Sequence, residues 1–213
     1  MDLSSPLRSI APGLDSAVLQ TLAGTESGLS ASQVARLAGR GTRVGLLPVL
    51  ARLVGHGVVL AEPANRGYLY RLNRSHVLAD AVVSAAGARR AIFDRLTEAV
   101  EILRPAPLSV SLFGSFARGE AGPDSDLDVL IVTAADLDPD TELAREWEQQ
   151  LQHLEDQVLA WTGNRLERLV MSVDRLRAAF ARDEPVIAAW SEEAITLTGL
   201  TTAELLEARA RTT

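Results

Sequence analysis

The 213-residue chain contains neither cysteine nor lysine, and all 21 of its basic residues are arginine. Without cysteine there can be no disulfide, thiolate metal site or cysteine nucleophile. Without lysine there can be no P-loop lysine and no Schiff-base chemistry. The three histidines, His56, His76 and His153, are far apart in the sequence and form no close-spaced ligand pair. Any bound metal is therefore expected to be a hard cation held by carboxylate oxygens.

Long apolar runs are also missing. No stretch approaches the roughly 20 uninterrupted apolar residues that a membrane span needs. The first 15 residues, MDLSSPLRSIAPGLD, lack the basic-then-apolar order of a secretory signal. With 47% hydrophobic and 23% charged residues, the composition is that of a globular protein able to bury a core. We therefore expect a cytoplasmic protein with no membrane association.

Charge is distributed unevenly along the chain, whose net charge is −7. Residues 1–75 carry eight arginines and four acidic residues, whereas residues 76–213 carry 13 arginines and 24 acidic residues. A basic smaller part joined to an acidic larger part suggests two modules with different partners. Ordinary variation of surface charge is the alternative interpretation.

The N-terminal third has the pattern of three helices followed by two strands. Ser30 and Thr42 are suited to cap the second and third helices. A polar tip at residues 63–67 separates the two strands. This order is typical of a winged helix-turn-helix. The expected elements are helices at 14–22, 31–38 and 43–55 and strands at 58–62 and 68–72.

The text LSASQVARLAGRGTRVGLLPVLARLVGHGVV resembles the winged-helix regulators of bacteria, and the resemblance covers about residues 12–73. In such modules the helix predicted here at 43–55 enters the major groove of DNA. Pro48 is expected to kink that helix. A winged helix that serves only as a protein–protein or dimer scaffold is the alternative, and a homodimer is a further expectation. The candidate DNA contacts are Arg40, Arg43, Arg52 and Arg66.

Residues 77–103 have helical periodicity and would join the two modules. We therefore expect an α+β protein with a winged helix-turn-helix at 1–75, a long linking helix at 76–104 and a third region at 105–213. That third region should contain a mixed sheet flanked by helices.

Candidate functional residues lie between two predicted strands, 108–113 and 129–132. Gly114 and Ser115 follow the first strand, and Asp126 and Asp128 lead into the second. Because alternate residues of a strand share a face, the two carboxylates should point the same way and repel each other unless a cation neutralises them. Magnesium is typically held by one or two carboxylates together with substrate phosphates. Glycine lets phosphates approach the backbone, and serine offers donors to them.

The text LFGSFARGEAGPDSDLDVLIV looks like the signature of the minimal nucleotidyltransferases of the polymerase-beta superfamily, and the resemblance covers about residues 90–200. It implies that Asp126 and Asp128 are the ligands of a catalytic Mg²⁺ or Mn²⁺. It also implies that Gly114 and Ser115 lie at the nucleotide phosphates, with Ser125 as a further candidate. Arg118 could contact the triphosphate, or it could pair with Glu120 or Asp124 to brace the loop.

The family pattern usually includes a third carboxylate on a later strand. Glu167 is the only acidic residue in the predicted strand at 165–172, so it is our candidate for a third catalytic metal ligand, although the family more often has aspartate. It could equally be a solvated residue paired with Arg165 or Arg168. Asp174 is the second candidate, but it follows Ser172 in a segment typical of a helix start.

The expected activity is transfer of a nucleoside monophosphate from an NTP, with ATP the expected nucleotide, to a hydroxyl of a protein, nucleic acid or small molecule. Stand-alone proteins that this region resembles often act as antitoxins that adenylylate a partner toxin. One alternative is a winged-helix regulator or antitoxin whose nucleotidyltransferase domain binds nucleotide with weak activity or none. Another is antibiotic adenylylation, which would not need the basic N-terminal module.

Overall fold

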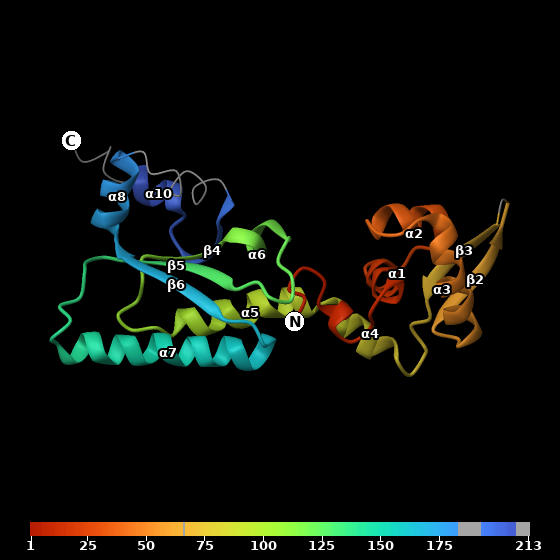
Figure 1. Cartoon of the computed structure of the whole chain (residues 1–213), viewed down its shortest axis with the longest axis horizontal. Helices are drawn as coiled ribbons and strands as arrows, with labels where there is room; N and C mark the ends of the chain where they lie inside the picture. The colour runs from red at the N-terminus through yellow and green to blue at the C-terminus, as the bar shows by residue number, and fades with distance from the viewer. Residues whose placement is uncertain (66, 183–192, 208–213) are drawn as a thin grey trace. The chain divides into compact units, whose positions relative to one another are not determined.

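The computed structural model describes residues 1–65, 67–182 and 193–207, and it divides into two compact units (Figure 1). The N-terminal unit comprises Asp2 and residues 4–90. The C-terminal unit comprises Met1, Leu3 and the described residues from Ala91 onward. No helix in the described ranges is long and apolar enough to cross a lipid bilayer.

The N-terminal unit packs its helices and a small sheet around one apolar core, which includes Val18, Leu22, Leu46, Leu50 and Leu72. The three-stranded sheet is antiparallel with the order β1-β3-β2. Its elements are η1 Pro6–Ser9, α1 Leu14–Ala23, β1 Leu29–Ser30, α2 Ala31–Leu37, α3 Arg43–Gly55, β2 Val59–Ala64, β3 Gly67–Leu72 and α4 Ala79–Ala86.

Helix starts in this unit follow the expected capping residues. The Ser30 hydroxyl accepts a hydrogen bond from the Gln33 amide, and the Gln33 side chain accepts one from the Ser30 amide, which completes a capping box at α2. The Thr42 hydroxyl caps α3 in the same way. Helix α3 continues through Pro48. The carbonyl that proline leaves without an amide partner belongs to Val44, in the exposed first turn of α3.

The predicted elements of the N-terminal unit are all present, and the structure adds the two-residue strand β1, where Leu29 pairs with Tyr70. Strand β1 is too short to show a periodic pattern in the sequence. The winged-helix interpretation of this unit stays a prediction.

The segment expected to form one linking helix differs from that expectation, because the structure has two helices, α4 and α5 (Ala88–Glu101), that meet at Gly87. Val82 and Val83 of α4 pack on the core of the N-terminal unit, whereas Ile92, Leu96 and Val100 of α5 are buried in that of the C-terminal unit. Glycine is among the weakest helix formers, so the helix breaks where its apolar face changes partner.

The C-terminal unit is built on a four-stranded mixed sheet with the order β6-β5-β4-β7. Strands β5 and β6 are parallel, and the β4–β5 and β4–β7 pairs are antiparallel. After α5, its elements are β4 Ser109–Phe113, α6 Gly114–Arg118, β5 Leu127–Thr133, α7 Glu142–Thr162, β6 Leu166–Ser172, α8 Val173–Ala181, β7 Ile195–Gly199 and α10 Thr202–Glu207.

Helices cover both faces of this sheet (Figure 1). On one face, Leu127, Val129 and Ile131 of β5 share a core with α5 and α7. On the other face, Leu130 and Val132 pack against α8 and α10. Asp128 precedes Leu130 and Val132 in the same alternating series of β5 residues, and it is only half-buried. Strand alternation therefore puts Asp128 on the α8–α10 face, just beyond its apolar cluster.

The predictions for the end of the chain have mixed outcomes. Ser172 caps α8, β7 lies where a closing strand was expected, and Thr201 and Glu204 form a capping box at α10. The helix expected at residues 186–190 lies outside the described residues.

Candidate active site

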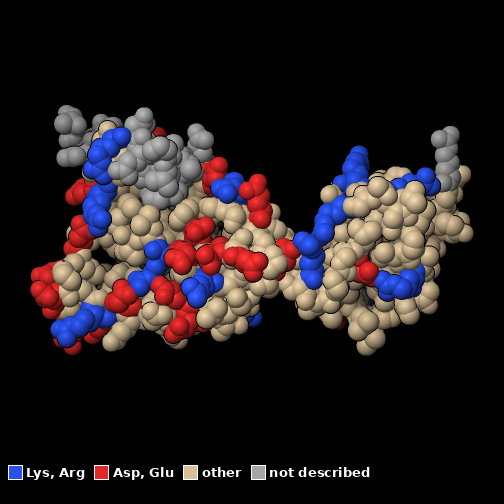
Figure 2. Space-filling view, viewed as in Figure 1, with Lys and Arg blue, Asp and Glu red and all other residues tan. Residues whose placement is uncertain are grey.

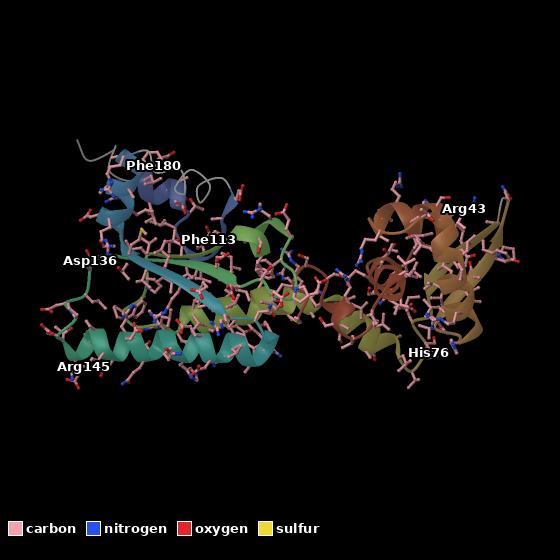
Figure 3. The ribbon with its side chains drawn as sticks, viewed as in Figure 1. Arg43, His76, Phe113, Asp136, Arg145 and Phe180 are labelled. Atoms are coloured by element: carbon pink, nitrogen blue, oxygen red, sulfur yellow. The ribbon has the colours of Figure 1, made fainter. Side chains whose placement is uncertain are left out.

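Gly114 connects β4 to α6 at a point that only glycine fits. Its φ is +68°, a conformation that side chains disfavour. A Cβ atom there would lie 2.2 Å from Oδ2 of Asp128, far inside contact distance. Phe113, labelled in Figure 3, precedes it, and the fully buried Phe116 anchors α6 by stacking on Phe93 with ring centroids 5.0 Å apart. The turn is therefore fixed by the core and brings its backbone against the Asp128 carboxylate.

Strand pairing brings two of the three candidate carboxylates side by side. Asp128 lies next to Glu167 in the parallel β5–β6 register, and next to Phe113 in the β4–β5 register. Asp126 lies just before β5 and is half-buried, and Leu127 between the two aspartates is fully buried. Asp128 and Glu167 thus share one face of the sheet at the end where β5 and β6 begin.

Asp128 has a perturbed acidity in this cluster of acids. The pKa of Asp128 is raised, first by burial and then by the negative charges of Asp126 and Glu167, while the positive charge of Arg118 acts in the opposite direction. Residues 1–65, 67–182 and 193–207 contain no group of three or more potential ligands already arranged to hold a metal ion. The candidate ligands are negatively charged carboxylate oxygens, which are the kind of ligand that a divalent cation such as Mg²⁺ prefers.

Arg118 makes the bracing contacts that were one of its two expected roles. Its Nε donates to Glu120 Oε2 at 3.0 Å, and its Nη1 donates to Glu193 Oε2 at 2.8 Å. It therefore ties α6 to the loop that follows it and to the segment just before β7. Its positive charge also reaches Asp128, where it partly offsets the rise in the pKa of that carboxyl.

The two serines of the motif differ in their surroundings. The Ser125 hydroxyl accepts a hydrogen bond from the Gly122 amide at 2.9 Å, so it shapes the turn before Asp126. For the Ser115 hydroxyl, no hydrogen bond is found within residues 1–65, 67–182 and 193–207.

The alternatives for the third carboxylate are separated by their contacts. Arg168, a possible partner of Glu167, instead pairs with Glu148 and Glu155 of α7. Asp174 lies in the first turn of α8, is 85% exposed and approaches Arg177 at 3.7 Å. Glu167 lies beside Asp128 in the sheet and is exposed, so its role as the third metal ligand stays a prediction.

Sequence reasoning missed Asn164, in the turn between α7 and β6. Its side chain is buried and donates to the carbonyl oxygens of Pro123 and Ser125, just before Asp126. An asparagine after a glycine marks a turn in the sequence, but nothing there indicates contacts 41 and 39 residues away.

The candidate DNA contacts of the N-terminal unit have different surroundings. Arg43, labelled in Figure 3, is exposed at the start of α3, and Arg40 is exposed just before that helix. Arg52 pairs with Asp15 of α1, which offsets its charge. Arg66 lies outside the described residues. Figure 2 shows few acidic atoms on the visible face of this unit, and many on the C-terminal unit.

Residues 94–179 match the family described as "Nucleotidyltransferase domain". The match covers less than half of the chain, lies within the C-terminal unit and spans Gly114, Ser115, Asp126, Asp128 and Glu167. We refer to this unit below as the nucleotidyltransferase-like unit.

No curated protein matches the chain. One solved structure, the crystal structure of a mutant of the toxin–antitoxin MntA-HpeT, covers 55% of this chain and 83% of its own. Its sequence identity is 10% and its TM-score is 0.35, which is too low to relate the two folds or their partners.

Proposed function

We propose that the nucleotidyltransferase-like unit transfers a nucleoside monophosphate from an NTP to a hydroxyl acceptor, with Mg²⁺ or Mn²⁺ held by Asp126, Asp128 and Glu167. The observation that carries this proposal is the contact between Gly114 and Asp128. It places a turn without a side chain against a carboxylate whose raised pKa reflects burial and two further acids. The family match over residues 94–179 supports the reaction class.

Each residue has a role that its position supports. Asp128 and Glu167, adjacent in the sheet, and Asp126, just before β5, supply carboxylate oxygens. Gly114 leaves the backbone accessible to phosphates, and the Ser115 hydroxyl can donate to their oxygens. A bound divalent cation would offset the charge of the acids, polarise the α-phosphate and promote ionisation of the acceptor hydroxyl. Arg118 braces α6 beside the acids, and its positive charge partly offsets the rise in the pKa of Asp128.

The deciding experiment is pyrophosphate release. Purified protein with Mn²⁺, an NTP (ATP, CTP, GTP or UTP) and a hydroxyl acceptor from each class in turn, protein, nucleic acid or small molecule, should transfer the nucleoside monophosphate to the acceptor and release pyrophosphate; ATP is the nucleotide that we expect it to prefer. The double variant Asp126→Ala/Asp128→Ala should not. Asp136→Ala is a matched control, because Asp136 is an exposed acid beyond the opposite end of β5, 3.8 Å from Arg175. If no nucleotide binds and none is consumed, the proposal is wrong.

The acceptor is left open by the same experiment, and it can be a protein, a nucleic acid or a small molecule. Retained nucleotide binding without turnover on any of these would favour the other function, that of a regulator or antitoxin that binds nucleotide without catalysis. Isothermal titration calorimetry on the wild-type protein and the double variant separates these outcomes.

A second proposal concerns the N-terminal unit, which we infer to be a winged helix-turn-helix that binds DNA. The observations that favour it are the order of three helices and a hairpin, and the exposed Arg40 and Arg43 at the start of α3. Their positions suit phosphate contacts. Helix α3 also exposes apolar side chains, including Val44 and Leu47, which suits a protein or dimer scaffold instead. Sedimentation and a DNA mobility shift assay distinguish the two roles.

A further inference from the structure

The turn between α7 and β6 contains a buried polar side chain that the candidate chemistry does not use. Asn164 is 4% exposed, and it follows Gly163, which ends α7 in the left-handed conformation with a φ of +73°. The backbone amide of Asn164 donates to the Thr162 hydroxyl at 3.0 Å, which holds the turn from within. Burying a polar side chain costs free energy unless its hydrogen bonds are made, so what Asn164 binds is informative.

Both donor contacts of the Asn164 side chain go to one loop. Its Nδ2 donates to the carbonyl oxygen of Pro123 at 2.8 Å and to that of Ser125 at 2.9 Å. The same loop is closed from within, because the Gly122 amide donates to the Ser125 hydroxyl at 2.9 Å. The Asn164 Oδ1 accepts from the backbone nitrogen of Met1 at 2.6 Å. The side-chain amide is thus engaged at both ends and held in one orientation.

This loop and this turn each lead directly into a strand that carries candidate metal ligands. Ser125 is followed by Asp126 and β5, and Asn164 lies three residues before Glu167 on β6. The parallel pairing of the two strands begins beside Asn164, where the Leu127 amide donates to the Arg165 carbonyl at 2.8 Å. Asn164 therefore joins the two chain segments at the point where both enter the site.

We propose that Asn164 is a positioning residue for the metal site, which sets where the backbone of Asp126 lies relative to β6 and Glu167. The inference rests on the proposed function, because it concerns the same site. Asn164 touches neither nucleotide nor cation in this proposal. It acts through the two carbonyls before Asp126, and removal of such a supporting interaction typically lowers metal affinity by roughly 10- to 100-fold.

The sharpest test is Asn164→Asp, which keeps the size of the side chain and removes its two donors. An aspartate there would face the carbonyl oxygens of Pro123 and Ser125 with another acceptor, so the loop should be released. Asn73→Asp is the matched control, because Asn73 also donates its Nδ2 to a turn carbonyl, that of Gly57, at 2.8 Å, in the N-terminal unit. The full chain is used for both variants.

Three measurements are made on the wild-type protein and both variants: Mn²⁺ affinity by calorimetry, amide hydrogen exchange, and the Mn²⁺ dependence of pyrophosphate release. For Asn164→Asp we expect Mn²⁺ binding at least about tenfold weaker. We also expect faster exchange at the Gly122 and Leu127 amides. For Asn73→Asp, Mn²⁺ affinity and both of these amides should be unchanged, even if its melting temperature falls.

Unchanged Mn²⁺ affinity and unchanged exchange at both amides in Asn164→Asp would overturn the inference. The same holds if the variant is destabilised as a whole but binds Mn²⁺ as the wild-type protein does. If Asn164→Asp does not fold, Asn164→Ser, which keeps one donor on a shorter side chain, should still bind Mn²⁺ more weakly than the wild-type protein. Wild-type affinity in that variant counts equally against the proposal. A wild-type protein that binds Mn²⁺ but turns over no NTP would contradict the proposed function. The Mn²⁺ affinities of the wild-type protein and Asn164→Asp would still decide the role of Asn164.

Discussion

The two units differ in how their charged residues are placed. In the nucleotidyltransferase-like unit, Asp128 follows the fully buried Leu127 and is paired through its backbone with strands on both sides. In the N-terminal unit, Arg40 and Arg43 lie on exposed positions. Asp128 is fixed in its position by the buried and paired residues around it, whereas the exposed arginines could be replaced without disturbing any core. A carboxylate that the fold keeps close to other acids, despite their repulsion, is therefore a stronger indication of a functional site than an exposed arginine.

The largest expected effect follows from neutralising one acid of the site. In Asp128→Asn, pyrophosphate release should fall by at least about 100-fold, because a ligand and its charge are removed from the place where charge develops. DNA affinity of the same variant, measured by mobility shift, should stay within about twofold if the N-terminal unit alone binds DNA. If DNA affinity decreased in parallel with pyrophosphate release, the two functions would not belong to separate units.

The next largest effect is expected at the glycine turn. Gly114→Ala should lower pyrophosphate release by about 100-fold, since a displaced carboxylate of this kind costs that much at an active site. It should also cost about 1–3 kcal/mol of stability, measured by urea unfolding, because of the positive φ. Gly122→Ala is the control, because a Cβ there would meet no atom within 4 Å. Equal effects of the two substitutions would show that the contact with Asp128 is unimportant.

How far the sequence could anticipate the molecule depends on the range of each interaction. The caps at Ser30 and Thr42 are local, and the sequence predicted them as they occur; for α8 it indicated Ser172 or Asp174, and Ser172 is the cap. The neighbourhood of Asp128 and Glu167 depends on β6 pairing in parallel with β5, across the whole of α7. Alternation along one strand gives the face on which a residue lies but not which strand comes next to it.

Side-chain pairs between distant segments were beyond sequence reasoning for the same reason. Arg118 reaches Glu193 across 75 residues, and Arg52 reaches Asp15 across 37. The second pair places an acidic partner beside Arg52, which the sequence did not indicate, and the role of Arg52 as a DNA contact stays a prediction. The break at Gly87 also reflects tertiary packing, because both helices around it have the same periodicity and differ only in the core they join.

A smaller effect is expected from the exposed arginines. Arg40→Ala/Arg43→Ala should weaken DNA binding several-fold and reduce the salt dependence of the logarithm of the binding constant by roughly 0.9 for each phosphate that the protein no longer neutralises. Arg71→Ala is the control in the same unit, since Arg71 pairs with Glu62 at 2.6 Å. An unaltered salt dependence in the double variant would remove DNA binding from these residues and favour the apolar surface of α3 as a protein-binding surface.

The smallest expected effect is on the stability of the metal-free protein. Because the pKa of Asp128 is raised in the folded state, the unfolded chain holds fewer protons between the ordinary carboxyl pKa and the raised one. Stability should therefore fall as pH rises through that interval. At pH 7, Asp128→Asn should melt a few degrees higher than the wild-type protein in EDTA. The difference should vanish below about pH 4.

Addition of Mn²⁺ provides the converse measurement for that stability comparison. A cation that binds only the folded protein raises its melting temperature by mass action. The wild-type protein should therefore be stabilised and Asp128→Asn much less so. If Asp128→Asn is the less stable of the two in EDTA at pH 7, burial and the neighbouring acids do not disfavour the charged form of Asp128 as its raised pKa indicates.

The first residues of the chain contribute to the nucleotidyltransferase-like unit, although the residues that follow them belong to the other one. Leu3 is completely buried in the core of the nucleotidyltransferase-like unit, and the backbone nitrogen of Met1 donates to Asn164 Oδ1 and to the Thr162 carbonyl. An affinity tag or fusion partner attached ahead of Met1 would thus emerge beside the turn that leads into β6. A comparison of tagged and untagged protein should therefore precede any assay of the candidate catalytic region.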